Sequence, residues 1–95
     1  MAEIRVKRKD DESFEVTVQE AHTTTHTVKL TKGYYEKLTG GEVPAETLIE
    51  KSFEFLLERE SNTMILSRFD LPVIGDYFPN FEKTIKGLLQ ELSGR

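Results

Sequence analysis

The pattern of apolar and polar residues divides the chain near residue 30 into a part with a period of two and a part with a helical period. Ile4 and Val6 alternate with charged residues, and Phe14, Val16 and Val18 alternate with polar ones. A threonine-rich stretch then continues the alternation. This period is typical of half-buried strands. We therefore predict a three-stranded antiparallel meander with strands over about 3–9, 13–19 and 22–30.

Beyond residue 30, apolar residues recur at spacings of three and four, which indicates amphipathic helices. Thr31 is a plausible N-cap for a first short helix, and Gly40-Gly41 supplies its C-terminal stop. Pro44 suits the first turn of the next helix. We predict helices over about 32–39, 44–60, 71–78 and 79–93. The resulting class is α+β, with the helices packed on one face of the sheet and residues 1–95 forming a single domain.

Composition narrows the function classes. The net charge of −4 argues against a non-specific polyanion binder, which needs clustered Lys and Arg. The chain has no cysteine, so disulfides, thiolate metal sites and cysteine nucleophiles are excluded. The opening MAEIRVKRKDDE lacks the apolar core of a signal peptide, and no apolar run approaches the ~20 residues that span a bilayer. We expect a cytoplasmic protein without membrane association.

Catalytic and metal-binding patterns are weak in this sequence. His22 and His26 lie four residues apart, but the three intervening threonines favour a strand. Four residues of strand separate the rings by about 13 Å, too far for one ion to bridge. The Gly40-Gly41 pair has neither the spacing nor the following Lys of a phosphate-binding loop. We therefore expect no enzyme activity, no cofactor and no metal site.

Aromatic residues cluster in FDLPVIGDYFPNFE and in the Tyr-Tyr pair of the first predicted helix. Their simplest interpretation is a packed cap over the sheet or the long helix. The alternative is that some of them are exposed anchors for a partner, because aromatic side chains dominate interface hot spots. The candidate partner-contact residues are Tyr34, Tyr35, Phe69, Tyr77 and Phe81.

The order of elements from His26 to Glu60 carries a family resemblance. The segments HTVKL, TKGYYEKL, GG and PAETLIEKSFEFLLERE are similar to the ribbon-helix-helix family of repressors and antitoxins. That resemblance implies that strands of two subunits pair and enter the major groove, with Thr25, Thr27 and Lys29 as candidate DNA contacts. The segments SFEFLLERE and FDLPVIGDYFP also resemble a family of short uncharacterised bacterial proteins, which implies no particular activity.

Taken together, these patterns predict a small non-catalytic binding or regulatory module that acts through protein–protein contacts. Its partner would be an unidentified protein or a second copy of the chain. The alternative is a DNA-binding regulator of the ribbon-helix-helix type. The DNA-binding hypothesis requires the stretch 22–30 to pair across a dimer, and the sequence leaves open whether it pairs in this way or within the chain.

Overall fold

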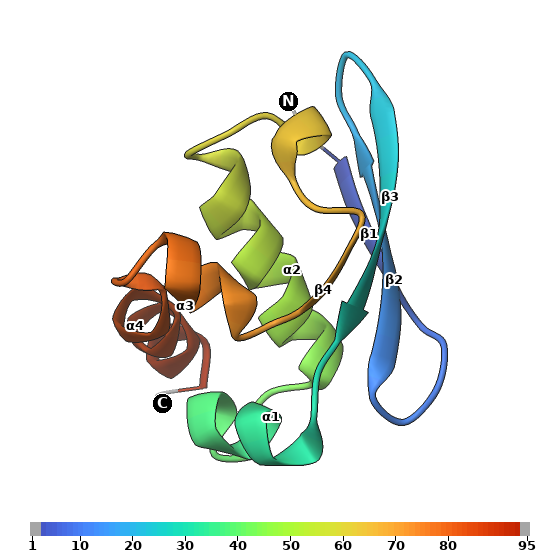
Figure 1. Cartoon of the computed structure of the whole chain (residues 1–95). Coiled ribbons are helices and arrows are strands. Elements are labelled where there is room, and N and C mark those ends of the chain that lie inside the picture. The colour runs from blue at the N-terminus through green and yellow to red at the C-terminus, as the bar shows by residue number, and fades with distance from the viewer. Residues whose placement is uncertain (1–2, 94–95) are drawn as a thin grey trace.

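The computed structural model, which describes the backbone of residues 3–93 and the side chains of residues 3–91, has one sheet with all helices on one of its faces (Figure 1). The strands are β1 (Glu3–Arg8), β2 (Ser13–Gln19), β3 (Thr23–Lys29) and β4 (Arg68–Asp70). The helices are α1 (Lys32–Thr39), α2 (Ala45–Leu57), the 3₁₀ turn η1 (Asn62–Met64), α3 (Val73–Tyr77) and α4 (Phe81–Ser93). The predicted α+β class and the one-sided helix layer are confirmed.

The first three strands form the predicted antiparallel meander, with Ile4 opposite Val18 and Val16 opposite His26. Alternate residues of the meander face the helices, and Phe14, Val16 and Val18 are almost fully buried. The opposite face is polar, and no helix of the described residues covers it (Figure 1). Alternation in the sequence therefore marks which side of each strand lies in the core.

A fourth strand corrects the predicted strand count. β4 pairs in parallel with the last three residues of β3, so that Val28 lies opposite Phe69. Flanking backbone bonds, from Thr27 N–H to the Ser67 carbonyl (2.8 Å) and from Leu71 N–H to the Lys29 carbonyl (2.9 Å), continue this pairing. Parallel neighbours need a crossover connection, and here α1 and α2 form it. The exposed–buried–exposed pattern of β4 spans three residues, which is too short for a period of two to identify a strand.

The helix boundaries follow local stop signals. The Thr31 hydroxyl accepts a hydrogen bond from Tyr34 N–H (3.2 Å), and Gly40 ends α1 with a φ of 64°, as the cap assignments predict. The second helix begins at Ala45 and ends at Leu57, three residues earlier than predicted. Its end tightens because Arg59 N–H and Glu60 N–H both bond to the Leu56 carbonyl.

The two C-terminal helices are shorter than predicted at their starts, beginning at Val73 and Phe81 instead of 71 and 79. Aromatic rings join this region to α2. The ring of Phe55 lies edge-on against Phe78, with centroids 5.9 Å apart, and against Phe81, with centroids 5.3 Å apart. These contacts fix the C-terminal half of the chain against α2 and place the segment 60–78 beside the sheet (Figure 1).

Candidate functional site

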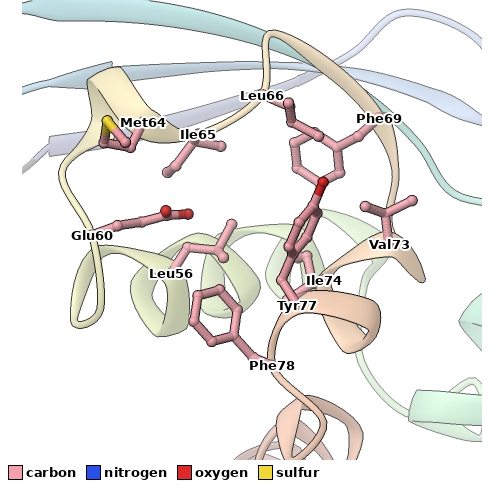
Figure 2. Close-up of a pocket in the computed structure, with 10 residues that line it drawn as sticks. All are labelled: Leu56, Glu60, Met64, Ile65, Leu66, Phe69, Val73, Ile74, Tyr77 and Phe78. Carbon is pink, nitrogen blue, oxygen red and sulfur yellow. The ribbon is translucent and has the colours of Figure 1, made fainter.

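The clearest concave feature is an apolar pocket built by the segment 60–78 and the end of α2 (Figure 2). Its volume is about 190 Å³. All but one of its side chains are uncharged, and most are aliphatic or aromatic. The lining residues are Leu56, Glu60, Met64, Ile65, Leu66, Phe69, Val73, Ile74, Tyr77 and Phe78. Because one sequence segment supplies nearly the whole lining, the path of that segment decides the shape of the pocket.

A chain of buried polar side chains attaches this segment to the sheet. Asn62 is 3% exposed, and its side-chain amide donates to the Thr24 hydroxyl (2.9 Å) and to the His22 carbonyl (2.8 Å). The Thr24 hydroxyl is also 2.9 Å from His26 Nε2, and His26 Nδ1 is 2.7 Å from the Leu66 carbonyl. The network therefore joins Asn62 to Leu66 of the segment through two side chains of β3, those of Thr24 and His26.

The direction of the hydrogen bonds in this network is fixed by its two ends. The Asn62 amide nitrogen can only donate, and the Leu66 carbonyl can only accept. A neutral His26 ring must therefore carry its hydrogen on Nδ1, so that Nε2 accepts from the Thr24 hydroxyl. The ring is 2% exposed and lies 5.4 Å from the Phe53 ring, which holds it in the core. We call this directed chain the Asn62–Leu66 relay.

Exposed apolar side chains gather around the mouth of the pocket. Among the described residues, the large hydrophobic side chains that are exposed are Met64 (69%), Leu66 (47%), Tyr77 (66%) and Leu88 (38%). The first three all line the pocket. Single exposed apolar residues are normal on a protein surface, whereas these three border one hollow.

The pocket also holds one carboxylate. Glu60 is half-buried, and Figure 2 shows its side chain pointing inward between Leu56 and Ile65, on the side opposite Tyr77. The neighbouring cation is engaged elsewhere, because the Arg59 guanidinium lies 3.6 Å from the Phe55 ring centroid and donates to the Phe55 carbonyl (2.8 Å). Within the part of the chain that the structure describes, Glu60 has no cationic partner.

The structure separates the five candidate partner-contact residues. Tyr77 is exposed at the rim of the pocket, and Phe69 forms part of its wall at 8% exposure. Phe81 is 0% exposed and belongs to the core, so it offers no surface to a partner in this structure. Tyr34 and Tyr35 are half-buried in the helix layer, where their hydroxyls donate to Glu82 (2.8 Å) and to the Val43 carbonyl (2.6 Å).

Sequence reasoning missed Met64, Leu66 and Glu60. A signal for the first two was present, because three apolar residues in a row, Met64 to Leu66, follow the end of a helix. In the structure Ile65 is buried, whereas Met64 and Leu66 on either side of it are exposed. No local signal assigns Glu60 to the pocket, because that depends on where the helix stops.

The ribbon-helix-helix resemblance implies that β3 pairs with a strand of a second subunit, whereas in the structure it pairs within the chain. In the sheet order β1-β2-β3-β4, one edge of β3 pairs with β2 along its whole length, and the other edge pairs with β4 along Thr27–Lys29. Thr25, Thr27 and Lys29 lie on the uncovered face of that sheet. An intersubunit ribbon needs a strand with a free edge, and β3 has none along its last three residues.

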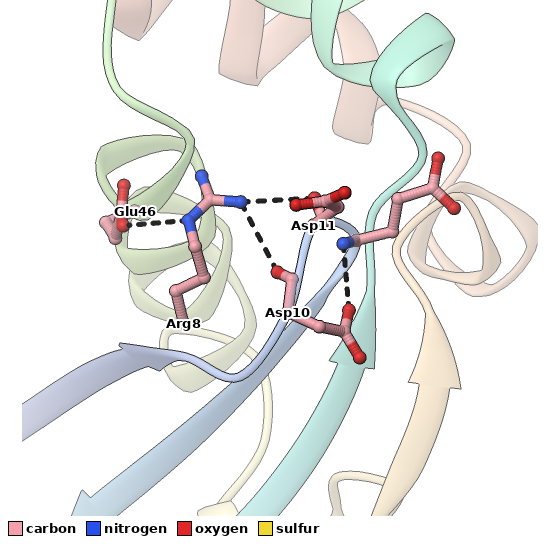
Figure 3. Close-up of polar contacts among 5 residues, drawn as sticks. Arg8, Asp10, Asp11 and Glu46 are labelled. Carbon is pink, nitrogen blue, oxygen red and sulfur yellow. Dashed lines mark hydrogen bonds and ion pairs between the residues drawn. The ribbon is translucent and has the colours of Figure 1, made fainter.

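An acidic hollow of about 1090 Å³ lies beside the β1–β2 turn, and several of its lining residues make structural contacts with one another (Figure 3). The Arg8 guanidinium donates to the carbonyls of Asp10 (3.4 Å) and Asp11 (3.1 Å) and pairs with Glu46 at 3.5 Å. A hydrogen bond from Glu12 N–H lowers the pKa of the Asp10 carboxyl. These contacts fasten the hairpin to the start of α2.

No protein-family model matches this chain, and no curated protein or solved structure matches it either. The described residues contain no group of three or more His, Cys, Asp and Glu side chains that could hold a metal ion. No helix in the same part of the chain is long and apolar enough to cross a bilayer.

Proposed function

We propose that this chain is a small cytoplasmic, non-catalytic binding module that docks a protein partner at the pocket of the segment 60–78. The observation that carries the proposal is the grouping of Met64, Leu66 and Tyr77, three of the four exposed large hydrophobic side chains of the described residues, around one apolar pocket. When a partner covers exposed apolar side chains, the free energy falls by roughly 25 cal/mol for each Å² of apolar surface removed from water.

The size of the pocket favours a protein partner over a small-molecule ligand. Sites for drug-sized ligands usually measure about 300–1,000 Å³, whereas this pocket measures about 190 Å³. That volume accommodates one apolar side chain. The exposed rim then offers additional contact area outside the pocket, which is the arrangement of an interface with a central anchor and surrounding contacts.

The polar content of the pocket supports a non-catalytic role. Acid–base catalysis by carboxylates uses two groups with different pKa values, and Glu60 is the single ionisable carboxylate among the lining residues. The other polar side chain is the Tyr77 hydroxyl. A site of this composition binds apolar groups and offers no second carboxylate to divide acid and base roles with Glu60.

Methyl NMR tests the docking surface directly. The probes are N-acetyl-leucine amide and N-acetyl-phenylalanine amide, each of which presents one apolar side chain. We expect saturable shifts at the methyl groups of Met64, Ile65 and Leu66, and the loss of the Met64 and Ile65 shifts in the double variant Leu66→Ser, Tyr77→Ser. Leu88→Ser removes an exposed apolar residue elsewhere and serves as the matched control. Shifts that never saturate, or that are the same in the double variant, would show that the pocket is not a binding site.

A further inference from the structure

We infer that the partner presents a Lys or Arg side chain next to the apolar side chain that enters the pocket; this inference rests on the proposed docking function. Its basis is the Glu60 carboxylate, the one charged group among the pocket-lining residues. Figure 2 shows this carboxylate directed into the pocket instead of away from it.

The protein leaves Glu60 without a positive charge of its own among the described residues. The nearest cation along the chain, Arg59, is held against the Phe55 ring and also lies 3.4 Å from Glu58. The next cation along the chain toward the C-terminus is Arg68, which is exposed on β4 opposite Thr27. Within the described residues, the half-buried Glu60 carboxylate therefore depends on water for its solvation.

Docking changes the surroundings of that carboxylate. An apolar anchor that fills the pocket removes water from Glu60, and a desolvated carboxylate without a partner is costly. A neutral neighbour on the anchor leaves this cost in place, and an acidic neighbour adds repulsion. A Lys or Arg neighbour supplies a charge-assisted hydrogen bond and offsets the lost hydration. The pocket therefore selects for charge as well as for apolar size.

The charge of the whole chain acts in the same direction. Its net charge of −4 attracts a basic segment and repels an acidic one before contact is made. Because Glu60 is half-buried, we expect the preference for a basic over a neutral neighbour to be about tenfold in Kd, the equivalent of about 1.4 kcal/mol. A fully enclosed pair would give a larger factor.

Selection from a random peptide display library tests the inference on the full chain. The wild type is expected to enrich peptides with a large apolar residue beside a Lys or Arg. Glu60→Gln should keep the apolar preference and lose the basic one. Glu60→Lys should enrich acidic neighbours instead, a gain that misfolding cannot produce. Circular dichroism of each variant checks that the fold is retained.

The possible failures are distinguishable. Apolar peptides that require Leu66 and Tyr77 but show no basic preference would overturn the inference and leave the docking function standing. Enriched peptides that bind the Leu66→Ser, Tyr77→Ser variant equally well, or no enrichment at all, would overturn both. A concentration-dependent mass in solution that Leu66→Ser abolishes would show that a second copy covers this surface, which would also overturn the inference.

Discussion

Removal of the Asn62 side chain tests whether the Asn62–Leu66 relay holds the pocket segment to the sheet. Asn62→Ala deletes hydrogen bonds of 2.8 Å to the His22 carbonyl and 2.9 Å to the Thr24 hydroxyl, and a longer contact of 3.3 Å to the Val18 carbonyl. Each good hydrogen bond contributes about 1 kcal/mol net, and a buried acceptor left without a donor costs more. We expect a loss of about 2–3 kcal/mol in the free energy of unfolding.

Urea unfolding followed by circular dichroism measures this loss, since the chain has no tryptophan to serve as a fluorescent probe. For a domain of this length the same loss lowers the melting temperature by about 10–20 °C. Thr63→Ala is the matched control, because Thr63 is exposed and its hydroxyl contacts only that of Ser61 among the described residues. We expect the control to change stability by no more than about 0.5 kcal/mol.

A second substitution separates hydrogen bonding from packing. Asn62→Asp keeps the shape of the side chain but replaces the donating amide with an oxygen that faces three acceptors. At neutral pH it should therefore destabilise the fold more than Asn62→Ala does. If Asn62→Ala unfolds at the same urea concentration as Thr63→Ala, or if the aspartate variant is the more stable of the two Asn62 substitutions, the relay does not hold the segment.

Three further predictions concern the helix layer. The Tyr34 hydroxyl and the Lys37 ammonium lower the pKa of the Glu82 carboxyl below its ordinary 4.5. The contact therefore stabilises the fold above that pH, and the stabilisation is lost as the pH falls through the folded-state pKa. Tyr34→Phe should lower the free energy of unfolding by about 0.5 kcal/mol at pH 7 and by less near pH 3, as measured by urea titration at both pH values. Gly40→Ala should lower the free energy of unfolding by about 1–2 kcal/mol, because the φ of 64° at this position strains a residue with a Cβ. Gly33→Ala should not destabilise the fold, because a Cβ added there has no atom within 4 Å. Thermal melting compares the two variants. Phe53→Ala should cost about 3–5 kcal/mol because its side chain is 0% exposed, and a smaller loss in calorimetry would show that the core collapses around the cavity.

The elements that the sequence predicts correctly are those whose cause is local. Alternation places Phe14, Val16 and Val18 on one side of β2, and Gly40 ends α1, without reference to the rest of the fold. The missed strand β4 has no local cause of this kind. It is extended because it pairs with β3, some 40 residues earlier in the chain, and pairing at that distance leaves no period in three residues.

The candidate site was predictable only in part for the same reason. An aromatic-rich segment near Phe69 and Tyr77 indicates an interaction surface, and both residues line the pocket. The sequence does not tell which rings are exposed, and Phe81 proved to be a core residue because α4 turns it toward Phe55. The polar relay was also hidden, since its members Asn62, Thr24 and His26 come from segments that only the fold brings together.

The short parallel pairing of β4 has a consequence for how the chain opens. The meander is held by two full antiparallel ladders, whereas the pocket segment is attached to it by three residue pairs and by side chains from β3. Segments held by fewer backbone bonds exchange their amide hydrogens through local opening at lower free energy. The Phe69 and Leu71 amides should therefore exchange sooner than that of Val16, and a bound partner should slow the first two most. Partner binding would then be recorded in the exchange rates of β4 while the meander remains unchanged.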